Sequence, residues 1–152
     1  MEKYNFQYCQ KIVVYSKDMD SVLLCKRKGE ADYDGDFSFI GGKMETTDQN
    51  IIEGLKREKS EEVGEDFKVK IYLDFTSSVS FVKKDGSAMI LPHYFSVYES
   101  GQIKLSDEYS EYKWVPIKEI GSFEPKIFTI PQILAKFEIL KEIISKTESI
   151  II

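Results

Sequence analysis

Cysteine is scarce in this chain, which holds only Cys9 and Cys25 among its 152 residues. The two do not form a CxxC pair, and two thiols alone cannot build a cysteine-ligated metal framework. We therefore expect reduced thiols in the protein core and a cytoplasmic location, because disulfides are rare there.

Long apolar runs and an excess of positive charge are also missing. No stretch approaches the roughly 18 apolar residues of a membrane-spanning helix, and the first residues, MEKYNFQYCQ, lack the apolar run of a signal peptide. The formal net charge is -5, whereas proteins that bind extended nucleic acids cluster lysine and arginine against phosphates. We expect neither a membrane nor an extended nucleic acid as partner. A small anionic ligand stays compatible with this charge if a local cation or a metal ion neutralises it.

The chain does contain enough apolar material for one core, since 42% of its residues are hydrophobic. At this length we expect a single domain over residues 1–152. Runs of β-branched and aromatic residues separated by turn-like segments predict strands. The predicted strands cover residues 11–15, 21–25, 69–75, 79–82, 88–98 and 112–115.

Two details refine these strands. Lys84-Asp85-Gly86-Ser87 is typical of a hairpin turn, because Asp-Gly tolerates the positive φ angles that primed turns need. Pro92 lacks a backbone N–H, which predicts an edge or irregular strand around it.

Two helices are predicted. The first covers residues 51–63, with Thr47 or Asp48 as its N-cap and Gly64 as a left-handed C-terminal cap. The second begins at Ile130, and its tail at residues 150–152 either frays or packs on a partner. The order of strands, helix, strands and helix indicates an α/β (α+β) fold, a mixed sheet flanked by helices. The apolar face of the second helix consists of Ile130, Ile133, Leu134, Phe137, Leu140, Ile143 and Ile144.

The predicted helix over residues 51–63 is strongly acidic on one side. At about 100° per residue, Glu58, Glu61 and Glu62 share a sector of about 100° beside the buried stripe. Like charges at this spacing repel, and burial should raise the pKa of Glu62 unless a cation holds it ionised. Such oxygen ligands suit Mg²⁺ or Mn²⁺, although an ordinary acidic surface helix has the same local pattern. The buried stripe consists of Ile52, Leu55, Lys59 and Val63.

The residues around the acids supply what a phosphate site needs. Gly41 and Gly42 permit close backbone approach, Lys43 adds a cation, and Arg57 lies beside the acids. The stretch resembles the Nudix box: a glycine, five residues, a glutamate, seven residues, then Arg-Glu-apolar-x-Glu-Glu-x-Gly-apolar. Residues 37–43 also resemble the aromatic-rich segment that leads into the box in that family, and residues 108–114 resemble its later Glu-containing loop and Trp strand. The residues that match the box are Gly42, Arg57, Glu58, Glu61, Glu62 and Gly64.

Three departures from the box stand out. One residue is inserted between Gly42 and Arg57, so Asp48 or Gln49 replaces the first glutamate of the box, depending on the end from which one counts. That glutamate helps to hold the arginine in the family, and Glu53, four residues before Arg57, is a candidate substitute. Apolar positions are replaced by Lys59, which must snorkel or find a carboxylate, and by Glu65.

The resemblance implies a Nudix-type α/β/α sandwich and a Mg²⁺-dependent hydrolase, with Mn²⁺ as an alternative metal. The implied substrate is a nucleoside triphosphate or another nucleoside diphosphate linked to a further moiety. Glu58, Glu61 and Glu62 are then metal ligands, with Glu61 as ligand or base, and the Gly42 carbonyl completes the shell. Arg57 orients these carboxylates. The alternatives are a non-catalytic nucleotide-binding regulatory module and, against the acidic charge, an mRNA decapping enzyme.

Outside the box the resemblance points to Glu108 as the catalytic base, while an exposed loop acid is the competing interpretation. Arg27 and Lys43 are candidate phosphate contacts, and Arg27 is equally compatible with a surface cation. His93, the only histidine, is expected to be packed or solvated rather than catalytic. The expected partner is a small nucleotide, and the expected oligomeric state is a monomer or a homodimer.

Overall fold

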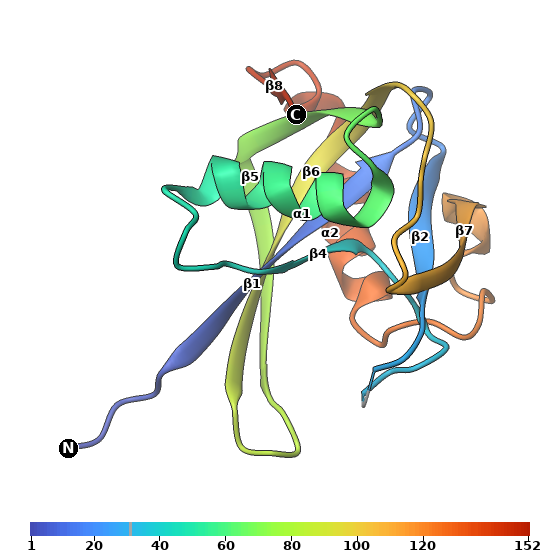
Figure 1. Ribbon diagram of the computed structural model, residues 1–152. Coiled ribbons are helices and arrows are strands. Elements are labelled where there is room, and N and C mark those ends of the chain that lie inside the picture. The colour runs from blue at the N-terminus through green and yellow to red at the C-terminus, as the bar shows by residue number, and fades with distance from the viewer. Residues whose placement is uncertain (31) are drawn as a thin grey trace.

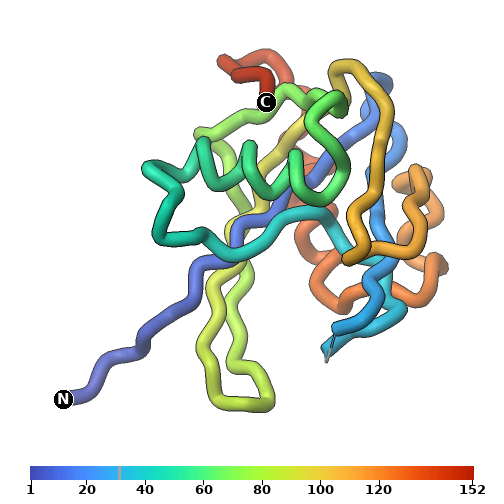
Figure 2. Tube along the Cα trace, in the orientation of Figure 1, coloured from blue at the N-terminus to red at the C-terminus, as the bar shows by residue number. Residues whose placement is uncertain are grey.

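The structure is a computed structural model that describes residues 1–30 and 32–152. Figure 1 shows its helices and strands, and Figure 2 follows the same chain as a tube. In chain order the elements are β1 (Phe6–Tyr15), β2 (Ser21–Arg27), β3 (Phe37–Ser38), β4 (Ile40–Lys43), α1 (Ile51–Val63), β5 (Lys68–Val82), β6 (Ala88–Ser100), β7 (Tyr109–Pro116), a 3₁₀ turn (Ile117–Glu119), α2 (Ile130–Ile144) and β8 (Ile150–Ile151).

The strands form one mixed sheet between the two helices. Its order is β3-β2-β1-β6-β5-β8, with β4 also paired to β1 and β7 to β2. β1 runs parallel to β6, and the other pairs of these strands are antiparallel. α1 lies in front of the sheet and α2 behind it (Figure 1). The predicted fold class, a mixed sheet flanked by helices, is confirmed.

The central strand β1 supplies side chains to a core on each face of the sheet. Val13 and Tyr15 join the apolar cluster that contains Phe137 of α2, while Ile12 joins the cluster that contains Leu55 of α1. Successive residues of a strand point to opposite faces, so an uninterrupted apolar run suits a strand that is covered on both sides.

Helix α1 has the predicted bounds, but its capping differs from the prediction. The N-cap is Asn50, whose Oδ1 accepts from the Glu53 N–H at 2.9 Å. Asp48 cannot serve there because its carboxylate is bound by the side chain of Arg57. Gly64 has a positive φ of 99°, which favours glycine, but its ψ of 150° is not that of a left-handed helical cap.

The predicted buried stripe of α1 is wrong at Ile52. This residue is 39% exposed, because the first turn lies outside the apolar cluster that covers Leu55 and Val63.

The sheet departs from prediction over residues 69–82, whereas around Pro92 the irregular strand, one of the two predicted alternatives, is confirmed. The separate strands expected over residues 69–75 and 79–82 are one strand, β5, whose register against β6 shifts between Tyr72 and Thr76. Pro92 does not lie at an edge, since β6 has β1 on one side and β5 on the other. The ladder between β6 and β1 has no pairs at Leu91 and Pro92, as expected where a proline supplies no N–H.

The C-terminal helix begins at Ile130 as predicted, but its apolar face is shorter. Leu140 and Ile143 are 40% and 61% exposed. After Phe137, the next residue of α2 that belongs to the buried apolar cluster is Ile144. The tail packs on this chain: β8 pairs with β5, and Ile152 is buried.

Two further observations concern the cysteines and the lack of a long apolar helix, both of which the sequence analysis considered. Cys9 and Cys25 are both buried and free. Within residues 1–30 and 32–152, neither helix is long and apolar enough to cross a membrane.

Candidate active site

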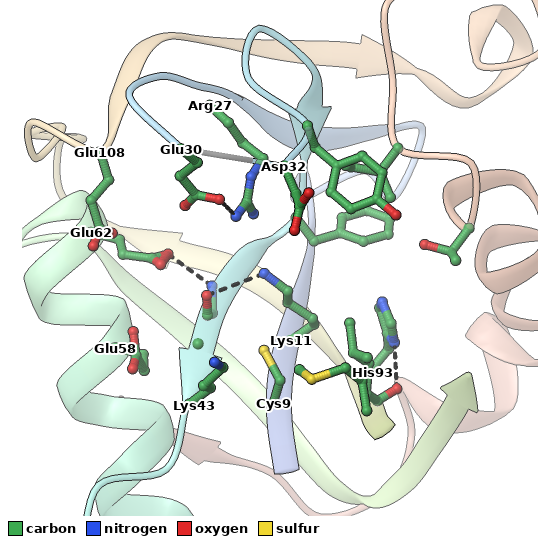
Figure 3. A pocket seen from close by; sticks show the side chains of 18 of the residues that line it. Cys9, Lys11, Arg27, Glu30, Asp32, Lys43, Glu58, Glu62, His93 and Glu108 are labelled. Atoms are coloured by element: carbon green, nitrogen blue, oxygen red, sulfur yellow. Dashed lines mark hydrogen bonds and ion pairs between the residues drawn. The ribbon is translucent and has the colours of Figure 1, made fainter. Parts of the chain in front are cut away.

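A pocket of about 560 Å³ opens between the carboxyl-terminal half of α1, the sheet and the loop before α2 (Figure 3). Alternate residues of two neighbouring strands form its floor: Cys9 and Lys11 from β1, and Met89, Leu91 and His93 from β6. The period of two along a strand explains why these side chains share one face.

Glu58 lies against the backbone of β4 because residue 42 is a glycine. A Cβ built on Gly42 would come within 2.6 Å of Glu58 Oε2, which is far inside van der Waals contact. Burial raises the pKa of Glu58, the neighbouring Arg57 lowers it, and the negative charges of Glu61 and Glu108 raise it again. Glycine at residue 42 therefore leaves space for the Glu58 carboxylate, which lies near the negative charges of Glu61 and Glu108.

Glu62 is the most deeply buried acid of the pocket, with 3% of its surface exposed. Its Oε2 accepts from the Gly41 N–H at 2.8 Å and from the Tyr109 hydroxyl at 2.9 Å. Burial raises the pKa of Glu62 to about 7, although the positive charge of Lys11 and the two hydrogen bonds act in the opposite direction. A carboxylate in this position gains strongly from a nearby cation.

Arg57 organises the acids of α1 without lining the pocket. Its Nε and Nη2 donate to the two oxygens of Asp48, both at 2.9 Å. Its Nη1 donates to Glu58 Oε1 at 3.0 Å and to Glu61 Oε2 at 3.1 Å. The hydrogen bonds to Asp48 raise the pKa of Arg57 further, so the guanidinium is a permanent charge.

The contacts of Arg57 decide which residue replaces the first glutamate of the box. Asp48 binds the arginine, whereas the proposed substitute Glu53 accepts from the Gln49 N–H instead. Among the described residues Lys59 has no carboxylate within ion-pair distance, and its buried Nζ donates to the carbonyls of Gly64 and Glu65, both at 3.3 Å. Burial lowers the pKa of Lys59 to about 8.

The two remaining predicted acids, Glu108 and Glu61, differ in their place relative to the pocket. Glu108, in the loop before β7, lines the pocket on the same side as Glu58 and Glu62 (Figure 3). Glu61 does not line it; 57% of its side chain is exposed, and it turns toward Arg57.

Four cations line the pocket, and they differ in their partners. Arg27 forms an ion pair with Glu30, and Lys83 lies 3.8 Å from Asp32. The exposed Lys43 and the buried Lys11 have no carboxylate within ion-pair distance in the described part of the chain. The predicted phosphate contacts Arg27 and Lys43 therefore lie in one pocket with the predicted metal ligands Glu58 and Glu62.

The donor set fits a hard divalent cation in its chemistry. Glu58, Glu62 and Glu108 offer only oxygen atoms, and the backbone at Gly42 lets a carboxylate approach closely. No three acidic, histidine or cysteine side chains converge as a ready metal cage within residues 1–30 and 32–152. Glu58 Oε1 accepts from Arg57 and Glu62 Oε2 accepts from the Gly41 N–H, so one oxygen of each carboxylate already has a partner within the chain.

Three residues of the site were not identified from the sequence. Lys11 and Tyr109 were not singled out, and His93 was expected to be packed or solvated. His93 is buried on the pocket floor, where burial lowers its pKa to about 4. A lysine inside the apolar run of β1 was the available signal for Lys11, whereas nothing local distinguishes Tyr109.

Comparison with known proteins identifies the family. The model of the NUDIX domain matches residues 8–137. No curated protein matches the chain significantly.

Solved structures show the same fold at low sequence identity. A MutT protein from Methanosarcina mazei Go1 is 22% identical, with a TM-score of 0.75 over 93% of this chain and 99% of that one. An Ap4A hydrolase from C. elegans, solved as a binary complex, is 16% identical, with a TM-score of 0.70 over 90% and 98%. The NUDIX domain of Shewanella oneidensis NrtR, solved with ADP ribose, is 19% identical, with a TM-score of 0.65 over 92% and 89%.

The match to the family model covers the segments that form the acidic side of the pocket. Residues 8–137 include the glycines of β4, the acidic face of α1 and the loop that carries Glu108. Because the match spans most of the sequence, the chain belongs to the Nudix family and is a Nudix pyrophosphohydrolase.

Proposed function

We propose that this enzyme hydrolyses the diphosphate bond of a nucleoside triphosphate, or of another nucleoside diphosphate linked to a further moiety, with Mg²⁺ as cofactor. One observation carries the proposal: the carboxylates of Glu58, Glu62 and Glu108 share a pocket with cations on its floor and rim. A diphosphate needs both, since its charge must be neutralised and a water molecule must be activated.

The metal would be held by Glu58 and Glu62, with the Gly42 carbonyl and Glu61 as further ligands. The chemistry that Mg²⁺ supplies when bound is neutralisation of phosphoryl charge and a lower pKa of a bound water, and Mn²⁺ can supply the same. Glu61 is the weakest member of this set because its side chain is mostly exposed. Its assignment as a ligand needs a change of rotamer toward the pocket.

The other residues have separate roles in the proposal. Glu108 accepts the proton of the attacking water on its carboxylate, since it lines the pocket near Glu58 and keeps access to solvent. Arg27 and Lys43 bind phosphate oxygens. Arg57 positions Glu58 through its hydrogen bond and does not touch substrate.

The similar structures support a nucleotide as substrate. One is an Ap4A hydrolase and another is a domain in complex with ADP ribose. A pocket of about 560 Å³ lies within the range of small-molecule sites. Both compounds therefore belong in the first substrate panel, together with the deoxynucleoside triphosphates and nucleoside diphosphate sugars.

The test is hydrolysis of this panel with Mg²⁺ by the wild type and by Glu58→Gln, Glu62→Gln and Glu108→Gln. We expect each substitution to lower kcat/KM by at least about 100-fold, equivalent to about 2.7 kcal/mol of transition-state stabilisation. Glu53→Gln is the matched control, because Glu53 is on the same helix and does not line the pocket.

Thermal stabilisation by Mg²⁺ separates ligands from the base. It should disappear in Glu62→Gln, which loses an assigned ligand, and persist in Glu108→Gln, whose side chain is assigned as the base and not as a ligand. No product from any substrate with the wild type, or full activity in both Glu58→Gln and Glu62→Gln, would show that the proposal is wrong. The cytoplasmic location and the choice between monomer and homodimer stay predictions.

A further inference from the structure

Lys11 is a buried cation of the pocket floor that lacks a carboxylate partner. Only 8% of its surface is exposed, and its Nζ donates one hydrogen bond, to the Gly41 carbonyl at 3.2 Å. In the part of the chain that the structure describes, no carboxylate lies within ion-pair distance of this ammonium. Since an ammonium has three N–H donors, two of them have no acceptor within those residues.

Such an arrangement costs stability. A buried charge is normally paired, and one neutral carbonyl does not replace the hydration that a lysine loses. The other cations of the pocket avoid this cost, because Arg27 and Lys83 have acidic partners and Lys43 is exposed. A residue that breaks the local rule in this way is typical of a functional position.

The place of Lys11 within the pocket defines what it can bind. In β1 it pairs with Gly41 of β4 on one side and with His93 of β6 on the other. Figure 3 shows its side chain between Glu62 and His93. The ammonium thus lies between the acidic residues of α1 and the side of the floor that β6 forms, and it contacts the backbone of Gly41.

We propose that Lys11 is a substrate-binding residue for the second phosphate of the diphosphate, next to the phosphate that a metal ion at Glu58 and Glu62 would bind. This inference rests on the proposed function, because both concern the same pocket. A phosphate brings a full negative charge and several acceptor oxygens, so it satisfies the free donors and neutralises the buried cation. A neutral carbonyl of a nucleobase would accept a hydrogen bond but leave the charge uncompensated.

The experiment compares the wild type with Lys11→Met, which keeps the length of the side chain and removes the charge. Lys84→Met is the control, since Lys84 is exposed in the turn between β5 and β6 and does not line the pocket. The probe is methylenediphosphonate, a non-hydrolysable diphosphate, titrated calorimetrically in the presence of Mg²⁺. Tm is measured without the probe, and kcat and KM are measured on the best substrate of the panel.

We expect Lys11→Met to weaken probe binding at least tenfold, equivalent to about 1.4 kcal/mol. Its Tm without the probe should equal or exceed that of the wild type, because the desolvation cost of the buried ammonium outweighs its attraction to the Glu62 carboxylate, which lies beyond ion-pair distance. The fall in kcat/KM should lie mainly in KM, as expected for a contact made in both ground and transition states. Lys84→Met should match the wild type in each measurement.

Three results would overturn the inference: no probe binding by the wild type, less than tenfold weakening in Lys11→Met, or weakening accompanied by a lower Tm. The last result would mean that Lys11 holds β4 in place through Gly41 and has no direct role in binding. Probe binding that depends on Lys11, without hydrolysis of any substrate, would support this inference while the proposed enzymatic function fails. The two proposals are therefore distinguishable.

Discussion

Arg57 donates two hydrogen bonds of 2.9 Å to Asp48, from Nε to Oδ1 and from Nη2 to Oδ2. Only 4% of the Asp48 side chain is exposed, and the hydrogen bonds from Arg57 lower its pKa to about 2. The same guanidinium reaches Glu58 and Glu61 with Nη1. Asp48, from the loop that holds the inserted residue, thus fixes the plane of the arginine that in turn orients the acids of α1.

Asp48→Asn should therefore reduce activity although Asp48 lies outside the pocket. Asparagine keeps the shape but cannot accept both hydrogen bonds, so Arg57 loses its fixed plane. Residues that orient metal ligands typically contribute 10- to 100-fold, and we expect a fall in kcat/KM of about tenfold or more. Glu53→Gln is the control, and equal kcat/KM in both variants would contradict the assignment of Asp48 as the partner of Arg57.

Gly42→Ala should damage activity much more than stability. The added Cβ would meet the end of the Glu58 side chain, which can rotate away at little cost in the free energy of unfolding. Displacing a catalytic group by about 1 Å can cost on the order of 100-fold in rate, so we expect a large fall in kcat/KM with nearly unchanged urea unfolding.

Gly121→Ala is the matched control, because a Cβ there meets no atom within 4 Å. It should leave both kcat/KM and the free energy of unfolding unchanged. A Gly42→Ala variant with wild-type activity would show that Glu58 does not need its position against β4.

His93 should make the protein less stable in mild acid. Burial lowers its pKa to about 4 in the folded state, whereas an unfolded histidine titrates near 6.5. Between these values the unfolded chain binds more protons, so stability is fully present above pH of about 6.5 and falls as the pH drops toward 4. The loss over this window should reach roughly 3 kcal/mol.

The measurement is urea unfolding of the wild type and of His93→Asn between pH 7.5 and pH 4.5. Asparagine retains an N–H that can reach the Leu91 carbonyl, which lies 2.9 Å from His93 Nδ1, but does not titrate. The difference in free energy of unfolding between the two proteins cancels the titration of carboxylates. This difference should change with pH in the stated direction, and a constant difference would contradict the buried neutral state of His93.

The end of the chain offers a matched pair for a test of packing. Ile152 is 3% exposed and exchanges two backbone hydrogen bonds of 3.0 Å with Val69, whereas Ile151 is 56% exposed. Ile152→Ala should lower the free energy of unfolding by about 2 kcal/mol, and Ile151→Ala by less than about 0.5 kcal/mol. Chemical denaturation of both variants checks this, and equal effects would mean that the tail does not pack on β5.

Local patterns predicted the elements well where they were long and strongly periodic. The bounds of α1 and the start of α2 follow from helical spacing of apolar residues, and Asp85-Gly86 correctly placed the turn between β5 and β6. The errors arose where distant residues compete for one group. The Asp48 side chain is of a type that caps helices, but its carboxylate accepts hydrogen bonds from Arg57. Asn50 caps the helix instead.

Periodicity also could not show how far each apolar face is covered. Ile52 and Ile143 fit the helical stripe of their helices, yet both are exposed. Spacing along one helix does not show which of its turns another element covers. For Pro92 the sequence left an edge strand and an irregular strand open, and the structure shows the irregular one, since the ladder to β1 omits pairs at that point.

The sequence alone determined the family resemblance, the acidic face of α1 and the glycines before it, because these depend on the identity and spacing of neighbouring residues. Only the tertiary structure decided that Asp48 holds Arg57, that Tyr109 binds Glu62, and that Lys11 and His93 form the pocket floor. The physical reason is that these relationships join strands and loops far apart in the chain. Their hydrogen bonds and burial exist only after β1, β4 and β6 have come together beside α1.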